Sequence, residues 1–266
     1  MITSSQNEHI KNLIRLRERR TRDKSSAFLI EGYRELSRAK DFVIETLYFA
    51  PEHFLGDNER ELIDEIAGRG AEIVRLSESL FSKVSYRDRP DGLIAIAQQE
   101  HLQLSDLPEK ESPFFLLGEA IEKPGNLGTM LRSADAVGVD GVIVCDPRTD
   151  IFNPNVVRAS VGTLFTQPVV QATTKETLKF LRERGIAIVA TTPQADLLYT
   201  DVDFTQPVAI AAGTEQLGLS EEFLRNADIR VRIPMCGVAD SLNVASATTL
   251  ILYEVLRQRT ILTRNN

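Results

Sequence analysis

The sequence predicts an α/β protein of two domains, and three observations lead to this prediction. Apolar runs of strand length alternate with helical patterns through most of the 266 residues. A polar, charged and proline-containing stretch at 105–112 interrupts that order, as a linker does. The chain length suits one large or two small domains. We therefore expect a small α/β domain at 1–106, a linker at 107–112 and a second α/β domain at 113–266.

The first domain begins with a basic segment of helical character. Its apolar stripe consists of Ile10, Leu13, Ile14 and Leu16. The first 24 residues hold seven basic and three acidic side chains, a net charge of +4, whereas the whole chain carries −7. Positive charge is therefore concentrated at this end. Such a segment is either a solvated basic helix or a surface that binds phosphate groups.

The rest of the first domain alternates short apolar runs with helical stretches such as 59–67, which predicts an α/β sandwich. The runs of strand length lie at 28–30, 46–49, 72–76 and 93–97. The first of them leads through Glu31 into a loop at Gly32.

The second domain repeats strand and helix in turn, the order of a parallel sheet. Its expected strands lie at 114–117, 141–145, 168–170, 186–190, 208–212 and 229–233. Its expected helices lie near 127–137, 153–164, 174–184 and 244–259. No Gly-x-Gly-x-x-Gly follows any strand, so a Rossmann dinucleotide site is not expected.

Other patterns limit the class of protein. No window approaches ~18 consecutive apolar residues, and the first residues lack the features of a signal peptide, so we expect a cytoplasmic protein without membrane spans. The three histidines have no partner at metal-ligand spacing, and no metal is expected. We expect Cys145 and Cys236 to be small buried hydrophobic residues without a chemical role.

Three segments share one build, in which an apolar strand runs into a loop with glycine and small polar residues. They lie at 116–134, 209–220 and 233–244. In the last of them a strand stops at Pro234, and Ser241 and Asn243 precede a helix. Backbone donors and small polar groups at such a rim indicate a ligand site.

In order and spacing, these motifs resemble the three signature motifs of the SpoU family of the SPOUT class, S-adenosylmethionine-dependent ribose 2'-O-methyltransferases of RNA. The resemblance covers roughly residues 114–259. It implies a parallel sheet whose C-terminal segment forms a deep trefoil knot, a rare exception among protein folds, with the cofactor among the knot loops. The first domain resembles, more weakly, the small RNA-binding domain related to ribosomal proteins that precedes many SpoU catalytic domains.

The resemblance also implies which residues form the site. Its catalytic residues would be Asn126, Arg132, Glu215, Ser241 and Asn243. Its S-adenosylmethionine-binding residues would be Thr191, Gly213, Ile233, Met235 and Leu242. The second motif departs from the common family form at Gln216 and Leu217, which leaves the details of that loop open.

Arg132 lies off the apolar stripe of its expected helix. Because a guanidinium stays protonated, we expect it to bind the phosphate beside the target ribose and to stabilise the developing alkoxide. The family mechanism is also described with this arginine as the base, and that alternative stays open.

Each of the other catalytic candidates has a purely structural interpretation. Asn126 and Ser241 are suited to cap helices, and Asn243 to be an ordinary first-turn residue. Glu215 could favourably meet the dipole of the helix that follows. The resemblance favours functional roles without excluding these structural ones.

For RNA binding we expect the basic segment to supply Arg15, Arg17, Arg19, Arg20 and Arg22. The first domain favours ribosomal RNA of the 23S type, with tRNA as an alternative. The last helix is apolar on two sides, which, with the resemblance, predicts a homodimer. Two other functions remain open, a SPOUT enzyme that methylates bases and a non-catalytic RNA-binding protein.

Overall fold

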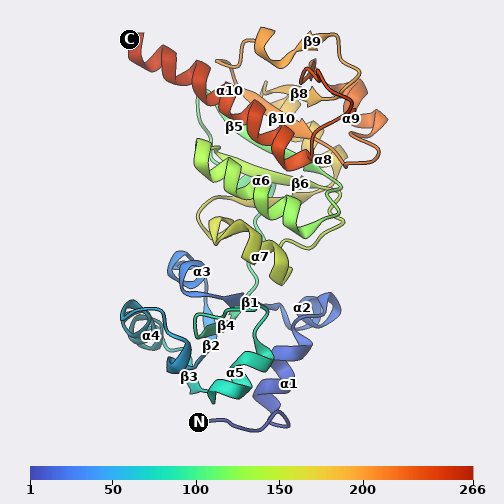
Figure 1. Cartoon of the computed structure of the whole chain (residues 1–266). Coiled ribbons are helices and arrows are strands. Elements are labelled where there is room, and N and C mark those ends of the chain that lie inside the picture. Colours follow the sequence, from blue (N-terminus) through green and yellow to red (C-terminus); the bar gives the residue numbers. More distant parts are fainter. Residues whose placement is uncertain (266) are drawn as a thin grey trace. The chain divides into compact units, whose positions relative to one another are not determined.

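A computed structural model describes residues 1–265 as two compact units (Figure 1). Unit 1 comprises Met1–Glu100 and Asp150–Thr166, and unit 2 comprises His101–Thr149 and the chain from Gln167 onward. The segment Asp150–Thr166 thus packs with the first unit although it lies inside the second expected domain, 113–266. Domain boundaries at 106 and 113 stay a prediction.

Unit 1 contains a four-stranded mixed sheet in the order β1-β4-β2-β3. Its strands are β1 (Ala27–Glu31), β2 (Ile44–Phe49), β3 (Glu72–Arg75) and β4 (Leu93–Gln98). Its helices are α1 (Glu8–Arg15), α2 (Arg19–Ser25), α3 (Tyr33–Arg38), α4 (Asn58–Gly68), α5 (Glu78–Val84) and α7 (Pro154–Ser160), with short 3-10 helices at Pro51–His53 and Thr163–Phe165. The basic segment is therefore two helices, broken between Arg15 and Arg19.

Strand β1 is covered on both sides because successive side chains point to opposite faces. Leu29 belongs to the core that Ile10 and Leu13 of α1 share with α5. Phe28 faces the other way, with its ring 4.6 Å from that of Phe152 and 5.9 Å from that of Phe165. The segment Asp150–Thr166 thus closes the second face of the sheet.

A buried ion pair fixes this segment. Arg22 is 1% exposed and donates through Nε and Nη2 to Oδ2 of Asp150, at 2.9 and 2.6 Å. Its Nη1 donates to the carbonyl oxygens of Leu16 and Arg17. The expectation that Arg22 contacts RNA is therefore wrong, because its guanidinium is buried and donates its hydrogen bonds to groups inside the unit.

We expect Arg22→Ala to lower the free energy of unfolding by about 3–5 kcal/mol, because it leaves Asp150 as a buried, unpaired charge. Urea denaturation followed by circular dichroism measures this. Arg19→Ala is the control, as Arg19 lies on the same helix with 55% of its side chain exposed, and it should change stability by no more than about 0.5 kcal/mol. Equal effects of the two substitutions would contradict the prediction.

Unit 2 contains a seven-stranded parallel sheet in the order β7-β6-β5-β10-β8-β11-β9. Its strands are β5 (Phe114–Glu119), β6 (Gly141–Cys145), β7 (Val169–Ala172), β8 (Ala187–Thr191), β9 (Leu197–Leu198), β10 (Val208–Ala212) and β11 (Ile229–Arg232). Its helices are α6 (Pro124–Val137), α8 (Thr174–Glu183), α9 (Glu221–Asn226) and α10 (Val244–Asn265), with 3-10 helices at Leu104–Asp106 and Tyr199–Asp201. The predicted α/β class and parallel sheet are confirmed.

Helices cover both faces of this sheet. Phe115 and Leu117 of β5 pack with Leu178 and Leu181 of α8 and with Phe223 of α9. On the opposite face α6 and α10 lie side by side (Figure 1). The trefoil knot stays a prediction. In the part of the chain that is described, no helix is long and apolar enough to cross a membrane.

The two cysteines differ. Cys145 on β6 is buried, and burial raises the pKa of its thiol to about 12, which keeps it protonated. Cys236 is exposed, so its expected burial is wrong.

Candidate active site

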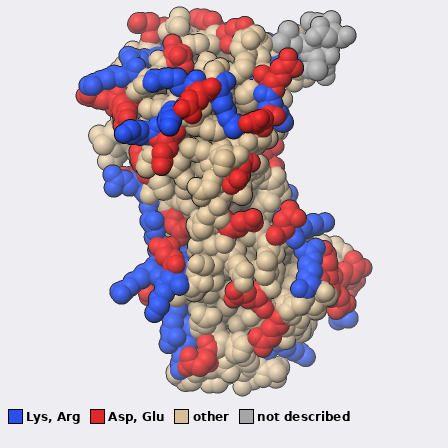
Figure 2. All heavy atoms as spheres, turned by 180° about the vertical axis from the view of Figure 1, so that it is seen from behind, with Lys and Arg blue, Asp and Glu red and all other residues tan. Residues whose placement is uncertain are grey.

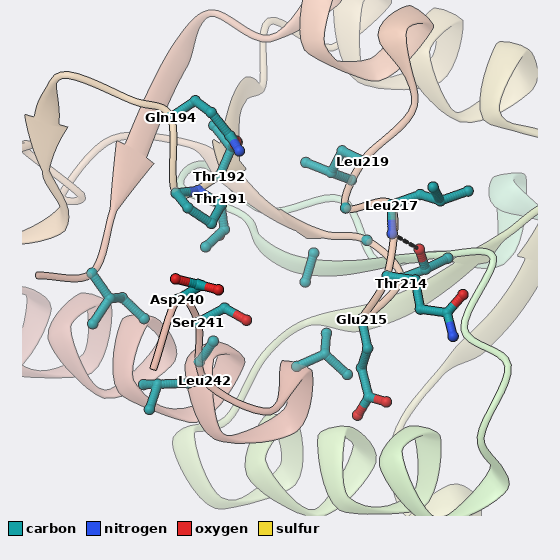
Figure 3. A pocket seen from close by; sticks show the side chains of 18 of the residues that line it. Thr191, Thr192, Gln194, Thr214, Glu215, Leu217, Leu219, Asp240, Ser241 and Leu242 are labelled. Atoms are coloured by element: carbon teal, nitrogen blue, oxygen red, sulfur yellow. Dashed lines mark hydrogen bonds between the residues drawn. The ribbon is translucent and has the colours of Figure 1, made fainter. Parts of the chain in front are cut away.

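A cavity of about 360 Å³ lies at the carboxyl edge of the unit 2 sheet (Figure 3). Loops that leave β8, β10 and β11 line it. These strands are neighbours and run parallel, so their ends meet at one edge, where ligands bind in α/β sheets. The volume is within the range of small-molecule sites.

All five predicted cofactor-binding residues line this cavity. They are Thr191, Gly213, Ile233, Met235 and Leu242. The buried Oγ1 of Thr191 has no hydrogen-bond partner among the described residues, and the carboxylate of Asp240 points into the same space (Figure 3). An apolar wall with a few polar groups of this kind fits S-adenosylmethionine, which combines a nucleoside with an amino-acid end.

The loop after β10 is a tight turn. The N–H of Thr214 donates to the carbonyl of Gly218, and the N–H of Gly218 donates back, both at 3.0 Å. Gly213 lies directly beneath, where a Cβ atom would be only 2.2 Å from the carbonyl carbon of Gly218. The family departure at Gln216 and Leu217 lies at the tip of this turn, and Leu217 is 89% exposed.

The three motifs meet at Glu215. Its Oε1 accepts hydrogen bonds from Nδ2 of Asn126 at 2.6 Å and from Nδ2 of Asn243 at 2.7 Å. Its Oε2 accepts from Nζ of Lys123, which also forms an ion pair with it. Figure 3 shows this side chain directed toward α6. One carboxylate of the second motif thus joins Lys123 and Asn126 of the first motif to Asn243 of the third.

These contacts decide the chemical character of Glu215. The hydrogen bond from Lys123, supported by those from Asn126 and Asn243, holds the pKa of this carboxyl below its usual range. An anion with lowered pKa and three donors is a weak base. We interpret Glu215 as the group that orients the two amides.

Asn243 also caps a helix, because its Oδ1 accepts the N–H groups of Ala245 at 3.0 Å and Ser246 at 3.4 Å at the start of α10. The structural interpretation of Ser241 as that cap is therefore wrong. Ser241 instead lines the cavity, and it is exposed.

Arg132 is not part of this cluster. It is exposed on α6, six residues beyond Asn126, and forms no hydrogen bond or ion pair with the described residues. Six residues along a helix correspond to a rise of about 9 Å and a different face. The chain by itself therefore brings together Asn126, Glu215 and Asn243 and leaves the Arg132 guanidinium available.

Two residues at the site were missed from the sequence, Lys123 and Asp240. Lys123 stands one helical turn before Asn126 in the first motif, and that spacing is the signal that could have found it. Asp240 is adjacent to Ser241 in the third motif.

We expect Lys123→Met to move the acid limb of the pH–activity profile to higher pH. The ionised form of Glu215 orders the amides, and this order is lost as pH falls through its lowered pKa. Removing Lys123 raises that pKa, so activity fails at higher pH than in the parent protein. Initial rates across pH measure the shift. Lys123→Arg, which keeps the charge, should retain the parent limb, and identical limbs for all three proteins would refute the role.

The parallel sheet, the cofactor-sized cavity at its carboxyl edge and the three loops joined at Glu215 define an α/β enzyme that uses a nucleoside-containing cofactor. Residues 113–253 match the SpoU rRNA Methylase family, and the chain belongs to that family. Residues 7–95 match the MRM3-like substrate binding domain. The family membership predicted from the three motifs is confirmed.

Relatives are similar over nearly the whole chain. The 23S rRNA (uridine(2479)-2'-O)-methyltransferase of Streptomyces viridochromogenes is 33% identical, covering 92% of this chain and 87% of that protein. The 23S rRNA (guanosine(2553)-2'-O)-methyltransferase RlmP of Bacillus subtilis is 30% identical, with 96% and 98% covered. The AdoMet-bound rRNA methyltransferase of Sinorhizobium meliloti superposes with a TM-score of 0.87 at 32% identity, with 96% and 97% covered.

Proposed function

We propose that this chain is an S-adenosylmethionine-dependent 2'-O-methyltransferase of 23S-type ribosomal RNA. The observation that carries the proposal is the meeting of Asn126, Glu215 and Asn243 beside a cavity lined by every predicted cofactor-binding residue. Full-length relatives with this activity in their names support the substrate class. Their target nucleotides differ, one uridine and one guanosine, so similarity alone selects no target.

The residues of the site would have different roles in cofactor binding, ribose orientation and charge stabilisation. When bound, S-adenosylmethionine supplies a methyl group on a sulfonium sulfur. Thr191, Gly213 and Leu242 would hold the cofactor, and the amides of Asn126 and Asn243 would orient the ribose. The chain must hold the ribose hydroxyl in line and assist loss of its proton. Arg132, which stays protonated, is suited to bind the adjacent phosphate and stabilise the developing negative charge.

RNA would bind through the basic segment of unit 1. Arg15, Arg19 and Arg20 are exposed on α1 and α2, and Figure 2 shows positive side chains gathered along the edge that these helices form. Arg17 is partly engaged, since its Nη2 donates to the carbonyl of Val84 at 2.6 Å and its guanidinium lies over the ring of Tyr86.

We expect replacement of Arg15, Arg19 and Arg20 by Gln to weaken RNA binding and to flatten its salt dependence. Each lost phosphate contact should reduce the slope of log K against log[salt] by about 0.7–0.9. Titration of ribosomal RNA fragments at several salt concentrations measures the slope, and calorimetry with S-adenosylmethionine should show unchanged cofactor affinity. An unchanged slope of log K against log[salt] would indicate that RNA binds to another surface of the protein.

The protein is proposed to act as a homodimer. Leu250 and Tyr253 of α10 are 42% and 48% exposed, and they lie three residues apart on one helix face. A second copy would cover this face, and the site near Arg132 would lie close to that interface, as the family resemblance implies. Sedimentation of Leu250→Asp should then show monomers.

A ribosomal RNA substrate also favours the expected cytoplasmic location.

The test of the proposed reaction is analysis of its product. Ribosomal RNA and tRNA that lack modifications are incubated with the protein and S-adenosylmethionine, digested to nucleosides and analysed by mass spectrometry. A 2'-O-methylated nucleoside from ribosomal RNA supports the proposal. A methylated base would indicate a base methyltransferase, methylation of tRNA alone would change the substrate, and no product would leave a non-catalytic RNA-binding protein.

A further inference from the structure

Unit 1 contains a second cavity, of about 610 Å³, separate from the cofactor site. It is lined by the start of α3, the loop before α4 with the first turn of α4, the loop that follows α5, and α7 with the residue after it. Its α3 residues, Tyr33, Arg34 and Glu35, directly follow the glycine loop after β1 that the sequence pattern had marked. None of the residues assigned to methyl transfer lines this cavity.

Three buried carboxylates line this cavity, and each has one oxygen in use and one without a partner. Glu35, Glu59 and Asp91 are 2%, 4% and 7% exposed. Oε1 of Glu35 pairs with Arg87 at 2.6 Å, Oε1 of Glu59 accepts the N–H of Leu55 at 2.9 Å, and Oδ2 of Asp91 accepts the N–H of Tyr33 at 2.8 Å. The second oxygen of each has no hydrogen-bond partner among the described residues.

Buried acceptors without donors cost free energy. Burial raises the pKa of Glu35 despite the neighbouring Arg87, which reflects this cost. The backbone at Gly32 packs closely against the carboxylate of Glu35. At Gly32, with φ +112°, a Cβ atom would lie 2.4 Å from the unpartnered Oε2 of Glu35. The arrangement suits a ligand that brings N–H groups.

The rim of the cavity carries positive charge. Arg34 and Arg158 are exposed and belong to its lining. Among the residues that the structure describes, no group of three His, Cys, Asp or Glu could hold a metal ion. The cavity thus combines three carboxylates and the Arg87 guanidinium, whose buried Nε also lacks a hydrogen-bond partner among the described residues, with two further cations at its mouth.

Resting on the proposed RNA substrate, we propose that this cavity binds one unpaired guanine nucleotide of that RNA. The N1–H and N2–H groups of the base would meet the unpartnered carboxylate oxygens, and the phosphate would lie beside Arg34 and Arg158. Sequence-specific proteins bind RNA at such unstacked bases. Guanine fits best because its Watson–Crick edge presents two adjacent donors, whereas uracil presents one.

The three oxygens are shielded from water in the free protein, so a lining side chain must shift when the base enters. Leu55 and Gly56, in the loop before α4, line the cavity and are exposed.

Binding of short RNAs by the full chain tests the proposal. Fluorescence anisotropy compares three labelled pentanucleotides of uridine whose central residue is guanosine, inosine or uridine. Inosine lacks only the N2 amino group. We expect the guanosine RNA to bind about tenfold more tightly than the inosine RNA, the discrimination typical of a paired hydrogen-bond contact.

Two substitutions locate this preference. In Glu59→Gln the amide oxygen must keep the Leu55 N–H, so the NH2 group replaces the unpartnered oxygen and opposes the donors of guanine. Glu35→Gln acts in the same way beside Arg87. Either change should abolish the preference, whereas Glu61→Gln, exposed on the same helix as Glu59, should retain it.

Equal affinity for all three RNAs would overturn the proposal, as would a guanosine preference that persists in both folded variants. Circular dichroism establishes that the variants are folded. No methyl transfer is measured, so failure of the proposed reaction would leave this result standing, and failure of guanine binding would leave the reaction intact.

Discussion

Arg132→Ala is expected to lower the rate of methyl transfer by about 100- to 1000-fold, the usual effect of removing a group that stabilises developing charge. Binding of S-adenosylmethionine should stay unchanged. Arg132 is exposed on α6, forms no bond with the described residues and does not line the cofactor cavity. Its loss therefore removes a charge from the reacting ribose and phosphate without disturbing the Glu215 cluster.

A radiolabel transfer assay and calorimetry with the cofactor measure the two quantities. Arg225→Ala provides the control, because Arg225 is also exposed and, among the described residues, pairs with Glu221 on its own helix. Its activity should equal that of the parent. Arg132→Lys keeps the charge but loses the two-pronged geometry, so intermediate activity is expected. Substantial turnover by Arg132→Ala would remove this residue from catalysis.

Gly213→Ala is expected to weaken S-adenosylmethionine binding about tenfold or more. The new methyl group would lie 2.2 Å from both the carbonyl carbon and oxygen of Gly218 and 2.3 Å from the nitrogen of Leu219. These are backbone atoms, so the turn that lines the cavity must open, and overpacking of this kind costs about 1–3 kcal/mol. Glycine is required here by the protein's own turn.

Calorimetry on the folded variant measures the affinity. Gly125→Ala is the matched control, because a Cβ atom there meets no atom within 4 Å. RNA binding should be the same for both variants, since the basic segment lies in unit 1. Parent-like cofactor affinity in Gly213→Ala would show that the turn accommodates a Cβ atom and that glycine is not required at position 213.

The sequence alone determined the alternation of strands and helices, the parallel sheet and the three ligand loops. Each of these is carried by a local signal, such as apolar periodicity or glycine after a strand. The predicted cofactor-binding residues came instead from the resemblance of these loops to the SpoU motifs, and the structure places all five around one cavity. Thr191 ends β8, and Gly213 and Ile233 directly follow β10 and β11, and parallel strands bring such positions to one edge.

Only the tertiary structure decided which partners these side chains have. Arg22 meets Asp150 across 128 positions, which turns an expected RNA contact into an internal ion pair. Lys123 and Asn126 reach Glu215 across 92 and 89 positions, which makes that carboxylate an organising anion. Contacts between residues so far apart depend on how the whole chain folds. No local periodicity or spacing in the sequence predicts them.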